Sequence, residues 1–290
     1  MDTKELLKKV KAIEIKTRGL TRQVFSGEYH SAFKGRGMAF SEVRDYTFGD
    51  DVRNLDWNVT ARFNSPFIKV FEEERELNIM LLIDLSESNN FGSKERSKKE
   101  LMLEIVAVLA FSAVANNDKV GAIFISDQVE KFIPPKKGKA HAMMILRHII
   151  DYTPKHKGTN LNEGLKYFRN VIKKRSIAFV ISDFIDYSSF LDGLKIANKK
   201  HDVVALRLTD PMEKTLPKIG ITQVYDAESG KSKWINTYSS KTREKYSRAF
   251  DKRTELFESS LKKTGVDFAS ISTDSQYLES LMNLFKRRAK

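Results

Sequence analysis

An aspartate and two serines stand at alternate positions directly after an apolar run. The run covers residues 79–83, and Asp84, Ser86 and Ser88 follow it. In an extended chain, side chains two residues apart point to the same side, so this segment would present one carboxylate and two hydroxyl groups together. Oxygen ligands with few carboxylates suit a hard cation such as Mg²⁺. The spacing therefore predicts part of a metal site.

Two more oxygen-bearing side chains are expected at the same place. Thr159 stands just before a predicted helix at 161–173, and Asp183 follows a buried strand predicted at 177–181. In parallel α/β sheets, ligands bind at the loops that follow the carboxyl ends of the strands. Asp183 would bind the metal ion there, either directly or through a water molecule. The predicted metal ligands are Asp84, Ser86, Ser88, Thr159 and Asp183.

A simpler interpretation is open for most of these residues. Serine, threonine and aspartate often cap helices. Asp84 and Ser88 would then cap a helix that starts near residue 94, and Thr159 would cap the helix at 161. The metal site is favoured because three separate segments supply these side chains in order, each after a predicted strand or at the start of a helix.

From residue 77 onward, apolar segments of strand length alternate with helical segments. Strands that are apolar at every position are buried on both faces, and helices between them imply right-handed crossovers and a parallel sheet. The predicted fold class is therefore α/β, with a doubly wound, mostly parallel sheet. The expected strands are 79–83, 120–125, 129–133 (at an edge), 177–181, 203–208 and 266–271, the expected helices are 94–116, 139–151, 161–173, 187–199, 239–263 and one from 274, and a polar hairpin covers 219–236.

The first quarter of the chain does not follow this pattern. An amphipathic helix is expected over 2–18, and the charged, glycine-containing stretch 20–76 predicts short strands and turns that end in an extended run at 66–71. We therefore divide the chain into a small, irregular, β-rich N-terminal extension, residues 1–76, packed on the core, and an α/β domain, residues 77–290.

The segment around Gly49 is interpreted as scaffold, with a docking surface as the alternative. Gly49 permits a turn, and the carboxylates of Asp50 or Asp51 can accept hydrogen bonds from turn amides. Forked guanidinium–carboxylate pairs would hold such an irregular region together, and Trp57 is expected to pack. The arginines available for these pairs are Arg44, Arg53 and Arg62.

Composition narrows the possible functions. The 290 residues contain no cysteine, which excludes disulfides, thiol catalysis and cysteine-ligated metals. The net charge is +13, most of it in residues 151–290. This charge favours acidic partners, although the interspersed acids make solvated helix faces the commoner explanation. Because neither an apolar leader nor a bilayer-length apolar run is present, the protein is expected to be cytoplasmic.

Nothing in the sequence combines a nucleophile with a base. The five histidines lack zinc-motif spacing and no phosphate-binding loop is present, so the protein is not expected to be an enzyme. The alternative is a Mg²⁺-dependent phosphodiesterase or a nucleic-acid-binding protein. Two-metal nucleases usually need more carboxylates than this site offers, and nucleic acid is an unlikely partner.

The order Asp-x-Ser-x-Ser, then Thr, then Asp resembles the metal-ion-dependent adhesion site of von Willebrand factor A domains. The resemblance implies that Asp84, Ser86, Ser88, Thr159 and Asp183 bind Mg²⁺, or another hard divalent cation such as Mn²⁺ or Ca²⁺. It also implies that one coordination position stays open for an Asp or Glu carboxylate of a protein partner.

A longer resemblance covers most of the chain. It is similar to the bacterial domain-of-unknown-function family fifty-eight, whose members contain a von Willebrand factor A-like domain and are often encoded beside AAA-plus ATPases of the MoxR type. The resemblance implies a non-catalytic adaptor that works with such an ATPase, or its client, in complex assembly or maturation. The segments that carry it are 35–46, 49–57, 61–62, 72–74, 118–121, 181–184 and 209–213.

Overall fold

A six-stranded sheet forms the centre of the molecule. The computed structural model describes residues 8, 11–12, 38–73, 76–92, 96–152, 158–186, 190–225 and 232–289. The strand order is β10-β7-β6-β3-β4-β5, and all neighbouring strands are parallel except β5, which pairs with β4 in the antiparallel sense. The strands are β3 (Asn78–Asp84), β4 (Lys119–Ile125), β5 (Val129–Lys136), β6 (Ile177–Ser182), β7 (Asp202–Thr209) and β10 (Asp267–Ser272).

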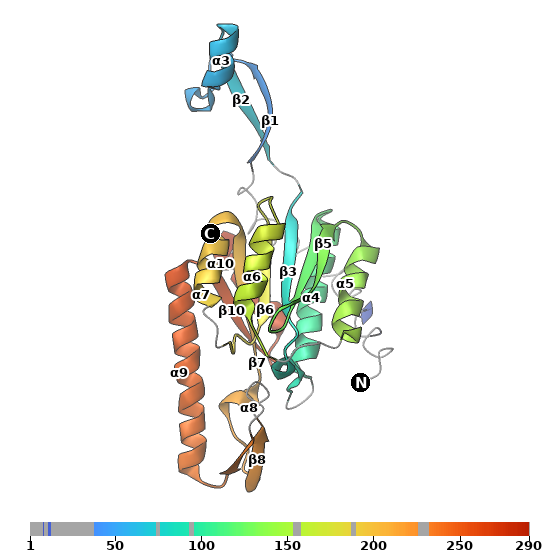
Figure 1. Cartoon of the computed structure of the whole chain (residues 1–290), viewed down its shortest axis with the longest axis vertical. Helices are drawn as coiled ribbons and strands as arrows, with labels where there is room; N and C mark the ends of the chain where they lie inside the picture. Colours follow the sequence, from blue (N-terminus) through green and yellow to red (C-terminus); the bar gives the residue numbers. More distant parts are fainter. Residues whose placement is uncertain are drawn as a thin grey trace.

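Helices cover both faces of this sheet because its central strands are apolar on both sides. In β3, Ile79, Leu81 and Ile83 belong to one buried cluster, whereas Met80 and Leu82 belong to the other. The first cluster includes α4 (Lys98–Ala115), α5 (Lys139–Asp151) and α10 (Tyr277–Ala289), and the second includes α6 (Leu161–Val171), α7 (Phe190–Lys200) and α9 (Ser240–Thr264). Figure 1 shows these helices on the two sides of the sheet.

The α/β fold class predicted from the sequence is confirmed. Each core strand and helix expected after residue 77 is present, with ends that differ by a few residues, and the segment at 129–133 is the antiparallel edge strand β5. Residues 93–95 and 187–189, at the expected starts of two helices, lie outside the described residues. The expected hairpin at 219–236 is present as β8 (Ile221–Tyr225) and β9 (Ser232–Asn236).

Two projections extend from opposite ends of the sheet (Figure 1). The first, here called the arm, is residues 38–73. It contains β1 (Met38–Asp45), η2 (Val52–Asn54), α3 (Trp57–Phe63) and β2 (Phe67–Glu73), and β1 pairs with β2 in the antiparallel sense. The second, here called the lobe, is residues 211–238. It contains α8 (Pro211–Lys214) and the β8–β9 hairpin.

The arm differs from its expected form in three respects. It stands out from the sheet (Figure 1), although the N-terminal extension was expected to pack on the core. It contains the helix α3, which is too short to give a periodic pattern and is instead defined by its Asp56 N-cap and the left-handed Asn64 C-cap. Trp57 was expected to pack, yet it is 70% exposed. The expected helix at 2–18 lies almost wholly outside the described residues.

The turn at the tip of the arm has the expected chemistry. Gly49 adopts a positive φ of 108°, a conformation that favours glycine. Asp50 accepts hydrogen bonds from the Thr47 amide at 2.8 Å and from both terminal nitrogens of Arg44 at 2.8 Å. Arg53 forms the corresponding pair with Asp51. These pairs lock the tip locally, as the scaffold interpretation predicts.

None of the helices in the described ranges combines the length and the apolar surface that a bilayer crossing requires.

Candidate metal site at the carboxyl edge of the sheet

Asp84 is the buried centre of the candidate site. It is the last residue of β3, and its side chain is fully buried. One carboxylate oxygen accepts a hydrogen bond from the Ser86 amide at 2.9 Å, and the other accepts one from the Ser182 hydroxyl at 2.5 Å. Burial and the neighbouring Asp183 carboxylate raise the pKa of Asp84 to about 6. Among the described residues, no Lys, Arg or His forms an ion pair with it.

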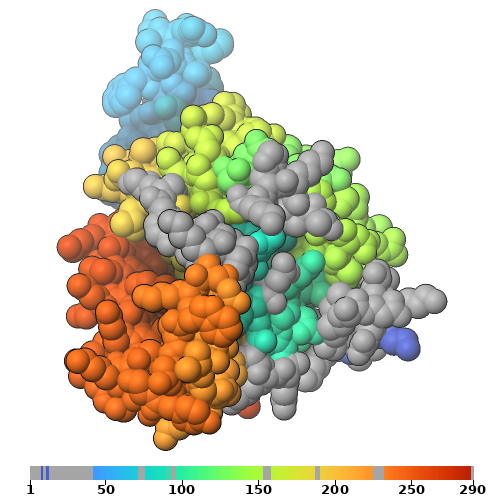
Figure 2. Space-filling model, turned by 60° about the horizontal axis from the view of Figure 1, so that its bottom comes forward, coloured from blue at the N-terminus to red at the C-terminus, as the bar shows by residue number. Residues whose placement is uncertain are grey.

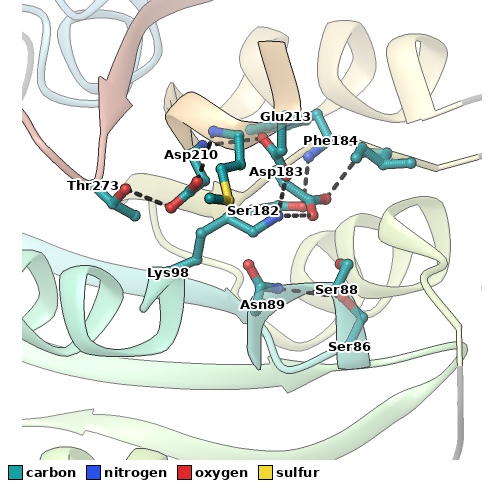
Figure 3. A network of polar contacts seen from close by, with 12 residues as sticks. Ser86, Ser88, Asn89, Lys98, Ser182, Asp183, Phe184, Asp210, Glu213 and Thr273 are labelled. Atoms are coloured by element: carbon teal, nitrogen blue, oxygen red, sulfur yellow. Dashed lines mark hydrogen bonds and ion pairs between the residues drawn. The ribbon is translucent and has the colours of Figure 1, made fainter. Parts of the chain in front are cut away.

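The two serines lie side by side in the turn after β3. Ser86 precedes η3 (Glu87–Asn90), and its hydroxyl oxygen is 3.0 Å from that of Ser88. The Asn89 amide nitrogen donates to the Asp84 carbonyl at 3.0 Å and to the Ser86 hydroxyl at 3.2 Å. Within the described part of the chain, the buried amide oxygen of Asn89 has no hydrogen-bond partner. Figure 3 shows Asn89 beside Ser86 and Ser88, with its amide nitrogen toward them.

Asp183 is held by a buried lysine. The Lys98 ammonium group donates to Asp183 at 2.8 Å and to Glu213 at 2.6 Å, and the Lys98 and Asp183 side chains are each 1% exposed. Although burial opposes the charge of Lys98, the two carboxylates raise its pKa above the ordinary value. The other oxygen of Asp183 accepts from the Ile185 amide at 3.0 Å. Phe184, between these two, has a positive φ of 55°, so the loop is strained where it positions Asp183.

The hydrogen-bond network continues into the lobe. Glu213 lies in α8 and accepts from the Asp210 amide at 3.1 Å, and Asp210 in turn caps α8 through the Met212 amide at 2.9 Å. The second oxygen of Asp210 accepts from the Thr273 hydroxyl at 2.7 Å, just after β10. One polar network therefore connects the starts of α4 and α8 with the ends of β6 and β10 (Figure 3).

Thr159 lies in a loop at the same edge. The next residue, Asn160, donates its amide to the Ser126 carbonyl at 2.7 Å, directly after the end of β4. Gly158, before Thr159, has a positive φ of 100°. The structure thus brings Asp84, Ser86, Ser88 and Asp183 into one polar cluster and places Thr159 in a neighbouring loop, half-buried.

Helix capping does not account for the predicted ligands. The N-cap of α4 is Ser97, which forms a capping box with Glu100, and the N-cap of α6 is Asn160, which accepts from the Glu163 amide at 3.2 Å. Asp84, Ser88 and Thr159 cap neither helix. Capping of these two helices is therefore not the reason for these three side chains at this edge.

The donor chemistry fits a hard cation. The Ser86 and Ser88 hydroxyl groups are hydrogen-bonded to each other at 3.0 Å. A Mg²⁺ ion with ligand bonds of about 2.1 Å places adjacent oxygens at about the same separation, so both hydroxyls could bind one ion with little movement. The raised pKa of Asp84 indicates a negative charge that the protein itself compensates poorly. Within the described ranges, no three His, Asp or Glu side chains are grouped as metal ligands, so a cation here depends on hydroxyl groups and water.

Sequence reasoning did not identify the residues that position the site. Lys98, Asn89, Ser182 and Glu213 were not among the candidates, although each contacts one of them or holds its loop. A signal existed for Lys98, because it continues the apolar stripe of α4 that includes Leu101 and Ile105, both fully buried. A lysine at such a position must find a buried carboxylate.

The sheet and this loop arrangement define a von Willebrand factor A-like α/β domain. Its fold is similar to that of an aerotolerance-related membrane protein from Bacteroides fragilis, at 15% identity over 73% of this chain and 98% of that chain, with a TM-score of 0.50. The VWA domain of SpRpn10 aligns with 73% of this chain and 95% of its own at 12% identity, with a TM-score of 0.40. The similarity to the Bacteroides fragilis protein supports the fold alone.

Residues 42–255 match the family described as "Protein of unknown function DUF58", and the chain belongs to this family. The match contains the sheet from β3 to β7, most of the arm and the lobe. A relative along the whole chain is the uncharacterized protein Rv1480 of Mycobacterium tuberculosis, which is 26% identical over 292 residues, covering 100% of this chain and 92% of the relative. The family resemblance inferred from the sequence is confirmed.

Proposed function

We propose that this protein is a non-catalytic adaptor that binds a carboxylate of a protein partner through a bound divalent cation. The observation that carries the proposal is the buried Asp84 carboxylate, which lacks an ion-pair partner among the described residues and lies beside the hydrogen-bonded hydroxyls of Ser86 and Ser88. Asp84, Ser86 and Ser88 would bind Mg²⁺ directly. Thr159 and Asp183 would complete or orient the ligand shell.

The cation, when bound, supplies an electrophilic anchor for an incoming Asp or Glu. The residues of the chain itself keep the ligands in place. Asn89 holds the Ser86 hydroxyl by its amide, and Lys98 holds the Asp183 carboxylate in position by donating to it. Because Ser86 and Ser88 are neutral ligands, the cation keeps a strong attraction for an external anion. This ligand set therefore favours capture of a carboxylate over hydrolysis.

A cavity beside the site gives the partner room for a second contact. It has a volume of about 300 Å³ and lies against Asp183, between the starts of α7 and α8 and the middle of α9. Its wall contains Arg207, which stacks over the rings of Phe250 and Phe257 and is almost fully buried. The same wall contains the Asp183, Asp186 and Glu213 carboxylates, so the cavity presents charges of both signs to a partner segment.

A Mg²⁺-dependent phosphodiesterase is less well supported. Asp183 is already paired with the Lys98 ammonium group, whereas Asp84 accepts hydrogen bonds from neutral groups alone among the described residues, so Asp84 is the main carboxylate for an ion. Phosphodiester cleavage by two metal ions usually requires more carboxylates. The MoxR-type AAA-plus ATPase implied by the family resemblance, or its client, is the partner that we propose.

The test is co-precipitation of the purified MoxR-type ATPase with the full chain, in Mg²⁺ and after EDTA. We expect Asp84→Ala and EDTA to abolish the interaction, whereas Asp192→Ala, which removes an exposed carboxylate on α7, should leave it unchanged. Binding that persists after EDTA would refute the metal-dependent contact. If the ATPase does not bind even in Mg²⁺, the partner assignment is wrong, and titration calorimetry with MgCl₂ alone still tests the metal site.

A further inference from the structure

An arginine is buried in the apolar face of the sheet that α9 covers. Arg207 lies in β7, on the same side of the strand as Val203 and Ala205, which belong to the buried cluster on that face. It is 6% exposed, and its guanidinium carbon lies 5.6 and 5.0 Å from the ring centroids of Phe250 and Phe257. Arginine is almost never fully buried unless it is paired, so a charge at this position needs a counter-ion.

Within the described ranges, Arg207 has no counter-ion of its own. It donates to the Thr254 hydroxyl at 3.1 Å and forms no ion pair with a described carboxylate. Glu213, the acid that attracts it most, accepts from the Lys98 ammonium group and the Asp210 amide instead. Burial, the largest influence on Arg207, lowers the pKa of its guanidinium group below the ordinary value. A bound anion would offset this cost of burial.

The acidic side chains in the wall of the neighbouring cavity are already engaged. Asp183 and Glu213 both accept from the Lys98 ammonium group, at 2.8 and 2.6 Å. Asp186 accepts from the Leu161 amide at 2.9 Å. Each of these carboxylates therefore has a donor within the protein, and the charged group left to bind a ligand deep in the cavity is the buried guanidinium.

The cavity has the size and the walls of a small-molecule site. Its volume of about 300 Å³ lies at the lower end of the range for such sites. Arg253 and Leu256, both exposed, belong to its wall, so it opens to solvent beside α9. Figure 2 shows α9 (orange to red) at the surface next to the lobe. The interior is apolar and largely aromatic, with Phe184, Phe190, Leu191, Phe250 and Phe257.

We propose that this cavity binds a small organic acid, with its carboxylate on Arg207 and its apolar body among the phenylalanine rings. The planar guanidinium fork matches a carboxylate, and the rings bury apolar surface. A ligand with one negative charge fits better than a phosphate ester, because the paired acids in the wall repel additional negative charge. This proposal goes beyond the proposed function, because the ligand is a free small molecule and its binding needs no metal ion.

The test is titration calorimetry of the full chain with 3-phenylpropionate, in the presence of EDTA. We expect saturable binding at one site. 3-Phenylpropionamide has the same apolar body without the charge and should bind at least about tenfold more weakly, because a charged hydrogen-bonded pair is lost. Propionate keeps the charge without the ring and should be weakened by at least about tenfold as well. No binding of 3-phenylpropionate at millimolar concentration, or equal affinity for the acid and the amide, would overturn the proposal.

Two substitutions change the cavity in different ways. Arg207→Met removes the charge and keeps an apolar side chain on an apolar face, so circular dichroism should show a folded protein that no longer distinguishes the acid from the amide. Ser260→Phe occupies part of the cavity from α9 and leaves the guanidinium group in place, so it should weaken binding of both ligands. Lys252→Met removes an exposed cation from the same helix and is the matched control, which should bind like the wild type.

The variants also decide between a small molecule and the end of another protein. Wild-type affinity for 3-phenylpropionate in Arg207→Met or in Ser260→Phe would show that the acid binds elsewhere and would overturn the proposal. Binding of a short peptide that ends in phenylalanine, without binding of 3-phenylpropionate, would assign the cavity to the carboxyl terminus of a partner and reject the small-molecule site.

Discussion

Both the arm and the carboxyl edge of the sheet contain ion pairs between a basic and an acidic side chain. The pairs in the arm are exposed, whereas the pair at the carboxyl edge is buried. In the arm, the Arg53 and Asp51 side chains are 86% and 44% exposed, whereas Lys98 and Asp183 are 1% exposed each. An exposed pair is screened by water and contributes little to stability. A buried pair is costly to form, yet removal of one partner leaves an unpaired charge. The difference suggests that the arm pairs shape a local turn, whereas Lys98 positions the site.

Lys98→Met is the strongest test of this comparison. The substitution leaves the buried Asp183 and the half-buried Glu213 without the Lys98 ammonium group, and loss of one partner of a buried pair costs about 3–5 kcal/mol. We expect a decrease of that order in the free energy of unfolding, measured by urea denaturation. Lys195→Met, at an exposed position on α7, is the control. Adding Asp183→Asn and Glu213→Gln to Lys98→Met should restore part of the loss, and a Lys98→Met protein as stable as the wild type would refute this role.

Asp84→Asn should separate the metal site from the fold. The variant keeps a side chain of similar shape but loses the charge that a cation requires, so the metal-free protein should remain folded. Wild-type protein should gain stability from Mg²⁺, by about 2.7 kcal/mol at a concentration hundredfold above Kd, and the variant should gain none. Thermal unfolding with Mg²⁺ and with EDTA measures the difference. Equal gains in both proteins would show that Mg²⁺ binds elsewhere.

The same carboxylate predicts a pH dependence. The pKa of Asp84 is raised from 3.8 to about 6 in the metal-free fold, so the folded state holds this proton more tightly than the unfolded state does. The contribution of Asp84 to stability is then present at low pH and is lost as the pH rises from about 4 to about 6. A bound cation requires the ionised form, so stabilisation by Mg²⁺ should be small near pH 5 and complete near pH 7.5. In Asp84→Asn, neither trend should appear.

The sequence predicted the sheet well because its strands are long apolar runs between helices with clear periodicity. It also identified the loop at Asp84, whose alternate spacing requires only local geometry. It did not predict the contact between Lys98 and Asp183, because that contact joins the first residue of α4 to the loop after β6, 85 residues further along the chain. Trp57 was misjudged for a related reason: an aromatic residue in an irregular segment packs only if a surface faces it, and no part of the described chain covers Trp57, which is 70% exposed.

Arg53→Ala and Arg44→Ala test the exposed side of the comparison and should have the smallest effects. Neither substitution should shift the urea midpoint measurably, because water screens these pairs. They should nevertheless differ from each other locally. Asp50, the partner of Arg44, also holds the Thr47 amide and hydroxyl, so Arg44→Ala should speed hydrogen exchange of the Thr47 amide, and Arg53→Ala should not. A large loss of global stability in either variant would mean that the arm is part of the core's folding unit, and the division at residue 76 would then be wrong.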